Sequence, residues 1–450
     1  MKIAVIGAGI TGLTAGYELA KAGHEVAVVE KEPVAGGLMA SFPFAGTQLD
    51  IVYHHIFVHS RATLALLDEL GLAGEMEWGV APSGYFHGGR VYRLATGFDL
   101  LRFKPLRFWE RIRFGLSILR AQRVADWREL DDVTAVDWLK SICGQRVYEV
   151  MWEPLLRSKF GDAYGCISAA WFWYKLHQRG GKKGGAERLG YLHGSFGRLA
   201  EALVAAIQER GGRVALDTPL ERIEWDGAGG SLRVGTADGE IQADRVLVTA
   251  APHVLLGAAP GLPDPYRGQL QAIDYAANLC VILALDRPLS DIYWLNVSDT
   301  RFPFGGVIEH TNLIEPARYQ GMHVAYLTRY LPTDHPNYRM SSDELLELYA
   351  PFLAELAPGF DRSWVREVHV FRSDFAAPVT PTGYGLRVPD LATPVPGLFM
   401  ANMSQIYPED RGVDCGVLLG QKAAARVLAA GDGDAPAAEA AECLSSSAPA

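Results

Sequence analysis

The first thirty residues carry the pattern that most constrains the fold. Residues 2–6 form a short apolar run, residues 7–12 read Gly-Ala-Gly-Ile-Thr-Gly, and a stretch with helical spacing follows and ends near Gly23. A second apolar run, residues 25–29, stops at Glu30. A strand, a G-x-G-x-x-G turn, a helix and a second strand closed by an acid together predict a βαβ unit that binds a dinucleotide.

Each glycine of this turn has its own physical role. Gly7 permits the tight turn, Gly9 lets a pyrophosphate approach the backbone, and Gly12 lets the helix pack close to the sheet. The N-terminus of the helix offers unpaired N–H groups and a positive dipole end to the anion, and Glu30 accepts hydrogen bonds from a ribose hydroxyl. The cofactor-binding residues predicted in this unit are Gly7, Gly9, Ile10, Thr11, Gly12, Glu30 and Lys31.

A second pair of glycines, Gly36 and Gly37, follows shortly after Glu30. A nicotinamide dehydrogenase rarely needs a second close backbone approach at this point, whereas in a flavoenzyme the chain passes alongside the rest of FAD. A plain turn is the alternative interpretation of the pair. We therefore predict that FAD is the dinucleotide and that Gly36, Gly37 and Leu38 contact it.

Charge, cysteine spacing and the length of apolar runs disfavour several classes of protein. The net charge of −10 disfavours general nucleic-acid binding. The five cysteines are scattered and form no C-x-x-C, so neither a disulfide framework nor a metal site is expected, and a reducing, cytoplasmic setting fits. No basic segment precedes the first strand and no apolar run reaches about 20 residues, so neither a signal peptide nor a spanning helix is expected.

The order of the predicted elements indicates an α/β fold, with a Rossmann-like FAD-binding domain and an inserted α+β substrate domain made of an antiparallel sheet plus helices. The near-continuous apolar run before Thr249 is typical of a central parallel strand. The predicted FAD-binding domain is discontinuous and comprises residues 1–75, 190–270 and 375–430. The predicted substrate domain comprises residues 76–189 and 271–374, and residues 431–450 are expected to be disordered.

Residues 102–128 form a basic segment in a chain whose net charge is negative. Seven basic residues between Arg102 and Arg123 alternate with Phe103, Phe108, Trp109 and Phe114. One interpretation is a helical surface that makes peripheral contact with anionic lipid or attracts an acidic substrate. The other is a solvated helical face over an apolar core.

The similarity to a known family extends over most of the chain. It rests on the following segments: the opening G-x-G-x-x-G with Glu30, Gly36-Gly37, residues 49–57, Glu153-Pro154-Leu155-Leu156, residues 194–203, residues 248–252, Ala401-Asn402 and residues 412–415. The chain resembles the FAD-dependent amine oxidase superfamily and, within it, protoporphyrinogen oxidase-like proteins. The resemblance implies an FAD-dependent oxidoreductase that moves a hydride from a substrate C–H bond to the flavin.

The resemblance also implies further cofactor-binding residues. In such proteins the N-terminus of the last helix points at the flavin, which here singles out Gly412, Val413 and Asp414. It places Val214 on the adenine side and adds Ala250 and Asn402 to the cofactor-binding set. The chain departs from the family beside the paired glycines, where many relatives have an arginine and this chain has Ala35 before them and Leu38 after them. A second departure is the loop that carries Glu409, Asp410 and Arg411, whose polarity disfavours a hydrophobic tetrapyrrole substrate.

Two other interpretations stay open. Residues 53–60, YHHIFVHS, also resemble the His-x-Phe region of UDP-galactopyranose mutases, which use the same cofactor without net redox change. The second is a flavin-binding protein without catalysis. The sequence does not identify the substrate, the electron acceptor or the oligomeric state.

The candidate catalytic residues are His55 and His54, because imidazole titrates near neutral pH and can orient a substrate or move a proton. A surface histidine beside a packing histidine is the alternative. We predict that Tyr53, Tyr384 and Tyr407 line the substrate pocket. Arg411 is predicted to pair with a substrate carboxylate or phosphate.

Overall fold

The N-terminal βαβ unit forms the middle of a five-stranded parallel sheet. The computed structural model describes residues 1–179, 187–226 and 231–430. The sheet has the order β10-β2-β1-β14-β20, in which β1 spans Lys2–Ile6, β2 Glu25–Val29, β10 Arg213–Ala215, β14 Arg245–Val248 and β20 Leu398–Met400. These strands are apolar along nearly their whole length because both faces of the sheet are covered.

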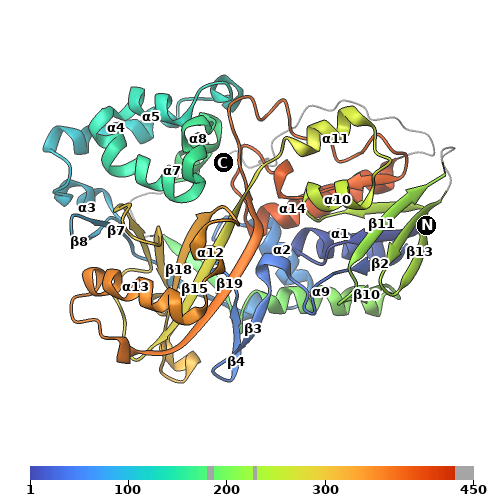
Figure 1. Ribbon diagram of the computed structural model, residues 1–450, viewed down its shortest axis with the longest axis horizontal. Helices are drawn as coiled ribbons and strands as arrows, with labels where there is room; N and C mark the ends of the chain where they lie inside the picture. Colours follow the sequence, from blue (N-terminus) through green and yellow to red (C-terminus); the bar gives the residue numbers. More distant parts are fainter. Residues whose placement is uncertain (180–186, 227–230, 431–450) are drawn as a thin grey trace.

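Three helices cover one face of this sheet (Figure 1). They are α1 (Ile10–Lys21), α9 (Gly197–Glu209) and α14 (Val413–Ala429). The last helix packs directly on the first, since a Cβ at Gly420 would lie 2.6 Å from the backbone oxygen of Thr11. This close packing brings the two ends of the described chain together. The other face carries a three-stranded antiparallel sheet and two helices: β11 (Leu220–Trp225), β12 (Leu232–Thr236), β13 (Gly239–Ala243), α10 (Pro252–Ala258) and α11 (Asp264–Gln271).

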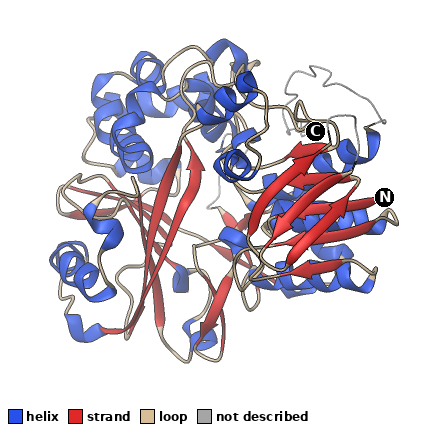
Figure 2. Ribbon diagram, turned by 45° about the vertical axis from the view of Figure 1, so that its right-hand side comes forward, coloured by secondary structure: helices blue, strands red, loops and turns tan. Residues whose placement is uncertain are grey.

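A seven-stranded sheet forms the second large layer, which Figure 2 shows as a separate group of strands. Its order is β19-β15-β18-β17-β16-β7-β8, and all neighbours are antiparallel except β16 and β7. The strands are β7 (Ser83–His87), β8 (Arg90–Arg93), β15 (Tyr275–Leu285), β16 (Trp294–Val297), β17 (Gly306–Glu309), β18 (His323–Leu331) and β19 (Val365–Pro378). Helix α13 (Ser342–Leu356) packs on one face through a core of aliphatic and aromatic side chains.

Helices from residues 97–179 surround a separate aromatic core that includes Trp138, Trp152, Trp171 and Trp173. They are α3 (Gly97–Arg102), α4 (Phe108–Ala121), α5 (Ala135–Cys143), α6 (Gln145–Val147), α7 (Glu153–Phe160) and α8 (Ala169–Arg179). Smaller elements join the layers: β3 (Ser41–Phe44), β4 (Thr47–Asp50), β5 (Ile56–Phe57), α2 (Arg61–Glu69), β6 (Met76–Val80), β9 (Arg188–Leu192) and α12 (Pro336–Arg339).

The predicted α/β class is confirmed, as is the antiparallel character of the sheet formed after residue 274. The predicted disorder of residues 431–450 concerns a segment outside the described residues. Within the described ranges, no helix combines the length and apolarity needed to cross a bilayer.

Candidate functional site

One large cavity runs from the opening βαβ turn to the antiparallel sheet and the aromatic helices. Its volume is ≈ 2710 Å³, whereas pockets for small molecules usually measure about 300–1,000 Å³. The cavity therefore has room for a dinucleotide together with a substrate.

The glycine turn shapes one end of the cavity. The backbone of Gly7 has φ +104°, which favours glycine, and a Cβ at Gly12 would clash with the backbone oxygen of Gly7. Gly9 differs, because a Cβ there would meet no protein atom within 4 Å and would project into open space. Gly9 is also the N-cap of α1, with no side chain capping the first turn. The helix thus presents free N–H groups to an anion.

Glu30 is held at the carboxyl end of β2 by backbone donors. Its Oε2 accepts from the N–H of Ala8 at 2.7 Å and its Oε1 from the N–H of Glu32 at 3.1 Å. These bonds fix the carboxylate on the cavity wall, where it can accept from ribose hydroxyls. Lys31 also lines the cavity and pairs with Glu32 at 3.2 Å.

The Gly36-Gly37 pair packs against the glycine turn of residues 7–12. The N–H of Gly36 donates to the oxygen of Ala8 at 2.7 Å, and a Cβ at Gly37 would lie 3.2 Å from the Cα of Gly9. Both glycines have positive φ, +118° and +58°. Leu38 follows them on the cavity wall. The pair is a turn, as the alternative interpretation has it, and it also forms one side of the cavity end built around Gly9.

Helix α14 adds a second uncapped N-terminus. Gly412 is its N-cap without a side-chain cap, and a Cβ there would also meet nothing within 4 Å. Gly412, Val413 and Asp414, which are predicted to bind the cofactor, line the cavity. The carboxylate of Asp414, however, accepts from the N–H and the hydroxyl of Thr63 at 2.8 and 2.9 Å, so it is engaged with α2.

These residues fit FAD. We call Gly7–Gly12, Glu30, Gly36–Leu38 and Gly412–Val413 the dinucleotide cradle. A Cβ at Gly9 or Gly412 would meet no protein atom within 4 Å, and the uncapped N-termini of α1 and α14 lie on the same cavity. In addition, the Nδ2 of Asn402, a buried residue on the cavity wall, has no hydrogen-bond partner among the described residues. Ala250 lines the same wall.

The structure places Val214, a predicted cofactor-binding residue, away from the cavity wall. Val214 lies inside β10, paired with Val28, and it does not line the cavity. The chain instead reaches the cavity at residues 218–220, because the N–H of Thr218 donates to the backbone oxygen of Glu30 at 2.8 Å. The Thr-Pro pair that ends the run after β10 is the sequence signal that marks this return.

The loop between β4 and β5 brings both candidate histidines to the cavity. The Nδ1 of His55 lies 3.1 Å from the hydroxyl of Tyr293, and burial lowers the pKa of His55 to about 4. Burial, with a smaller contribution from the charge of Arg411, lowers the pKa of His54 to about 3. Both imidazoles are therefore neutral at neutral pH.

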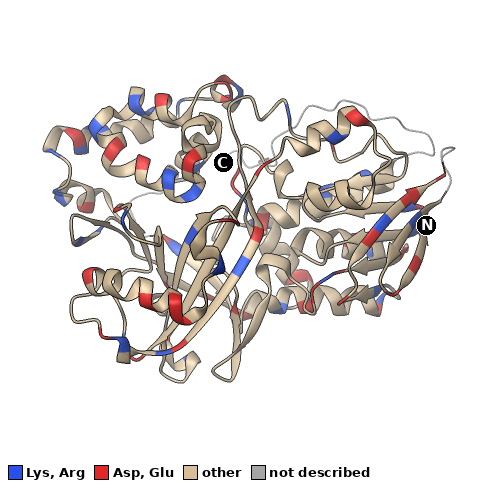
Figure 3. Cartoon of the chain, viewed as in Figure 1, with Lys and Arg blue, Asp and Glu red and all other residues tan. Residues whose placement is uncertain are grey.

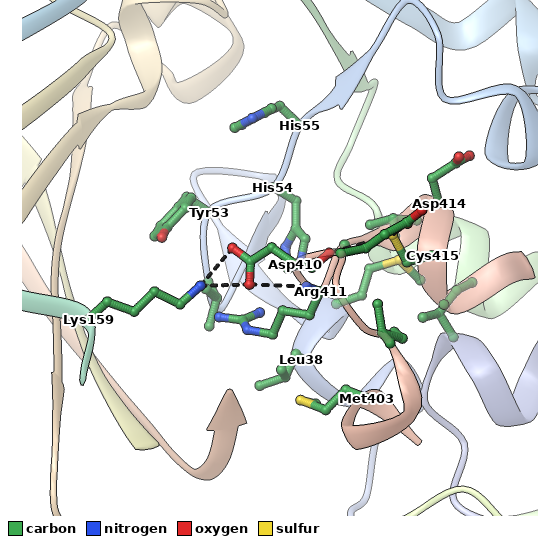
Figure 4. Close-up of a pocket in the computed structure, with 18 of the residues that line it drawn as sticks. Leu38, Tyr53, His54, His55, Lys159, Met403, Asp410, Arg411, Asp414 and Cys415 are labelled. Carbon is green, nitrogen blue, oxygen red and sulfur yellow. Dashed lines mark hydrogen bonds and ion pairs between the residues drawn. The ribbon is translucent and has the colours of Figure 1, made fainter. Parts of the chain in front are cut away.

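A cluster of charges lies beside these histidines (Figure 4). The carboxylate of Asp410 accepts from Lys159 at 2.6 Å and from Lys175 at 2.5 Å. The Nη2 of Arg411 donates to the hydroxyl of Tyr330 at 2.6 Å. Burial lowers the pKa of Lys159, and although burial opposes it, the charge of the two lysines holds the pKa of Asp410 below its usual range.

The two lysines were absent from the residues predicted from the sequence. They lie on α7 and α8, more than 230 positions before Asp410, and no spacing rule joins such residues. We call the part of the cavity around residues 53–55, Lys159, Lys175, Tyr330 and residues 410–411 the chamber. Tyr53 belongs to it, with its ring 5.1 Å from that of Trp294 in a T-shaped arrangement.

Two of the predicted pocket tyrosines are not in the cavity wall. The hydroxyl of Tyr407 donates to the carboxylate of Asp131 and lies 2.8 Å from the hydroxyl of Ser168. The hydroxyl of Tyr384 donates to the backbone oxygen of Ser404 at 2.8 Å. Both rings are buried in the aromatic core, where their hydroxyls find partners away from the cavity, so the structure gives no support to their predicted place in the substrate pocket.

Comparison with known proteins decides the family. A family model described as flavin containing amine oxidoreductase matches residues 10–428. The chain belongs to the flavin-containing amine oxidoreductase family.

Relatives in this family include a putative flavin-containing monoamine oxidase of Mycobacterium tuberculosis, 29% identical over 287 residues. That match covers 59% of this chain and 60% of the relative, so the chain spans less than two thirds of the relative's length. A D-amino acid dehydrogenase of Cereibacter sphaeroides is 28% identical over 69% of this chain and 72% of that protein. The crystal structure of a putative protoporphyrinogen oxidase from Exiguobacterium sp. 255-15 has the same fold, with a TM-score of 0.76 and 18% identity over 95% of this chain and 98% of that one.

Membership in this family confirms the predicted FAD cofactor and agrees with the predicted class of FAD-dependent oxidoreductase, and the solved structure shares the predicted Rossmann-like fold. It favours the oxidoreductase over the redox-neutral sugar mutase and over a flavin-binding protein without catalysis. A small-molecule substrate is consistent with the family.

Proposed function

We propose that the protein removes a hydride from a C–H bond of a small or mid-sized organic substrate, as an oxidase, a dehydrogenase or a desaturase. The observation that supports this most strongly is the single cavity that joins the dinucleotide cradle to the chamber. FAD, when bound, supplies the hydride acceptor. The protein's own residues hold the cofactor, orient the substrate and exclude water.

The cradle and the chamber divide this work. The uncapped N-termini of α1 and α14 stabilise negative charge at the cradle. In the chamber, Tyr53 and Trp294 provide an aromatic wall against which an apolar or aromatic substrate body can pack. Substrate placement between the two regions follows from the continuity of the cavity.

His55 is proposed as the residue that accepts a proton from the substrate. Its Nδ1 is engaged with Tyr293, and among the described residues we find no hydrogen-bond partner for its Nε2. A neutral imidazole with a free nitrogen can take a proton from a substrate N–H or O–H group. His54, whose Nδ1 lies 3.8 Å from the buried carboxyl of Asp50, is proposed to support the position of this loop.

The test of this function is anaerobic reduction. The FAD-loaded protein should lose its oxidised flavin absorption when a substrate from a panel of amines, amino acids and unsaturated compounds is added, and air or an added acceptor should restore it. Dithionite serves as the control that reduces any accessible flavin. A sugar-nucleotide isomerisation that needs reduced flavin, without net oxidation, would contradict the proposal.

We also propose that α3 and α4 rest on an anionic lipid surface. Six large apolar side chains are exposed on this pair of helices, among them Trp109 at 75% and Phe98 at 58%: Phe98, Leu101, Phe108, Trp109, Leu116 and Leu119. Arginines recur along the same helices (Figure 3), at Arg102, Arg111, Arg113 and Arg120. Exposed apolar side chains beside basic ones are typical of interfacial helices rather than of a solvated face, and this supports the lipid interpretation of residues 102–128.

Vesicle sedimentation tests the lipid contact. The protein should sediment with vesicles rich in phosphatidylserine and less with purely phosphatidylcholine vesicles, and Trp109→Ser with Phe108→Ser should abolish sedimentation. Leu386→Ser is the matched control, because Leu386 is 90% exposed and lies outside these helices. Equal sedimentation of the double variant would contradict the proposal.

A further inference from the structure

The chamber holds an arginine whose charge is not matched. Arg411 donates to a neutral partner, the hydroxyl of Tyr330. Within the described residues no carboxylate lies within ion-pair distance of its guanidinium. Its neighbour Asp410 instead accepts from Lys159, as Figure 4 shows, and from Lys175. A half-buried cation that has only a neutral hydrogen-bond partner is costly, unless an anion can enter beside it.

The charged side chains around Arg411 leave an excess of positive charge in the chamber. The charged side chains of the chamber that act on one another are Lys159, Lys175 and Arg411 on the positive side and Asp410 on the negative side. Glu409 lies next to Asp410 on the cavity wall, but its carboxyl accepts from the Sγ of Cys415 at 3.1 Å and burial raises its pKa, which favours its neutral form. Even with Lys175 set aside, Lys159 balances Asp410 and Arg411 remains. This excess of positive charge stands on the cavity wall of a protein whose net charge is −10, so it is a local property of the chamber.

The chamber also offers an apolar surface next to these cations. The Nζ of Lys159 lies 4.7 Å from the centroid of the Trp171 ring, and Tyr53 stands against Trp294. All these residues line the same cavity as the dinucleotide cradle. A ligand with an aromatic or apolar body and one anionic end would satisfy both features, because a planar guanidinium binds carboxylate and phosphate oxygens through parallel hydrogen bonds.

We propose that the substrate carries a carboxylate or phosphate group, which binds Arg411 while Lys159 and Lys175 hold Asp410 and while the oxidised carbon lies toward the dinucleotide cradle. This inference rests on the proposed function, since it assigns the substrate class of the same site. Arg411 is a substrate-binding residue in this account, and the lysines act by holding Asp410 away from it.

Four ligands that share one ring test the proposal. The FAD-loaded protein is titrated with benzoate, phenyl phosphate, benzamide and benzylamine, with calorimetry for the Kd and the visible flavin spectrum as a reporter of position. At least one anion should bind about tenfold or more tightly than benzamide, and benzylamine should bind most weakly. The ratio between benzoate and phenyl phosphate tells which anionic group is preferred.

A variant and a matched control locate the effect. Arg411→Gln should raise the Kd of the preferred anion about tenfold or more and leave benzamide unchanged. Arg301→Gln, which removes a surface arginine paired with Asp299 and Glu355, should change neither. Lys175→Gln should have a smaller effect than Arg411→Gln.

Three results would overturn the proposal. The first is equal or tighter binding of benzamide or benzylamine, and the second is no binding of either anion. The third is loss of FAD from Arg411→Gln, which would assign the guanidinium to the cofactor. FAD content and dithionite reduction are measured on the same samples, so a wild-type protein that lacks flavin would refute the proposed function itself, whereas a loaded protein without anion preference would refute this inference alone.

Discussion

The dinucleotide cradle and the chamber are built in different ways. The cradle is made of backbone: glycines without Cβ atoms, two uncapped helix N-termini and a carboxylate held by backbone N–H groups. The chamber is made of side chains that come from α7, α8, β18 and two loops. A backbone site recognises a group common to many enzymes, a diphosphate, whereas a side-chain site can change its substrate by changing a few residues.

The largest expected effect separates the cradle from the chamber. Gly9→Val should abolish FAD binding, because the new side chain occupies the space through which the pyrophosphate approaches the backbone, while no protein atom lies within 4 Å of a Cβ there. The variant should therefore fold without flavin, as judged by circular dichroism and flavin content. Gly268→Val is the control, since its Cβ also meets nothing but lies in α11. Stoichiometric FAD in Gly9→Val would show that the cradle is misassigned.

The second effect belongs to the chamber. His55→Ala should slow flavin reduction by the substrate about 10²- to 10⁴-fold, the usual range for loss of general acid–base catalysis, with FAD content unchanged. Rapid-mixing absorbance measures the reduction rate. His24→Ala, at a half-buried histidine near the N-terminus that does not line the cavity, is the control. An unchanged rate in His55→Ala would remove this residue from the chemistry.

The pH dependence sharpens the same assignment. Because burial lowers the pKa of His55 to about 4, the imidazole stays unprotonated throughout the neutral range and loses its free nitrogen only as the pH falls toward 4. The reduction rate should be flat from neutral pH to about pH 5 and should fall below it. A midpoint near the ordinary histidine value of about 6.5 would contradict the burial of this side chain.

A smaller effect is expected for the carboxylate of the cradle. Glu30→Ala should weaken FAD binding about tenfold to a hundredfold, because a charged acceptor for the ribose hydroxyls is lost. The variant also frees the N–H groups of Ala8 and Glu32. Equilibrium dialysis of FAD against the apoprotein gives the Kd, and Glu240→Ala on the exposed strand β13 is the matched control. Unchanged affinity would place the ribose elsewhere.

The smallest effect tests a residue that lies outside both regions. Tyr384→Phe removes the hydroxyl that donates to the backbone oxygen of Ser404, which should cost about 1 kcal/mol in the free energy of unfolding. Denaturant unfolding measures this loss, and flavin reduction should be unaffected because the ring does not line the cavity. A large change in the rate of flavin reduction with an unchanged free energy of unfolding would show that Tyr384 acts at the substrate pocket.

The cradle was predictable because its determinants are local. Gly7, Gly9, Gly12 and Glu30 lie within thirty residues, and each role follows from the missing Cβ or from the end of a strand. The position of Val214 away from the cavity wall has a local cause as well. The short strand β10 ends at Ala215, and the chain reaches the cavity only at the turn that follows.

The chamber was predictable only in part. Tyr53, His54, His55 and Arg411 were predicted to lie at the substrate site and do line the cavity. Other details depend on tertiary contacts: Lys159 reaches Asp410 across 251 positions, and Tyr407 turns its hydroxyl to Asp131 rather than to the cavity. The sequence around a tyrosine looks the same whether its ring lines a pocket or lies in a core. The hydrogen-bond partner of its hydroxyl, which only the structure shows, distinguishes the two positions.

The central claim is that the N-termini of α1 and α14 hold one FAD in the cavity they share. The most direct measurement is to release the cofactor from the purified protein by heat, identify it by mass and quantify it per chain. We predict one FAD for each chain, and its loss in Gly9→Val. A protein that releases no flavin, or that binds only a nicotinamide dinucleotide, would contradict the account.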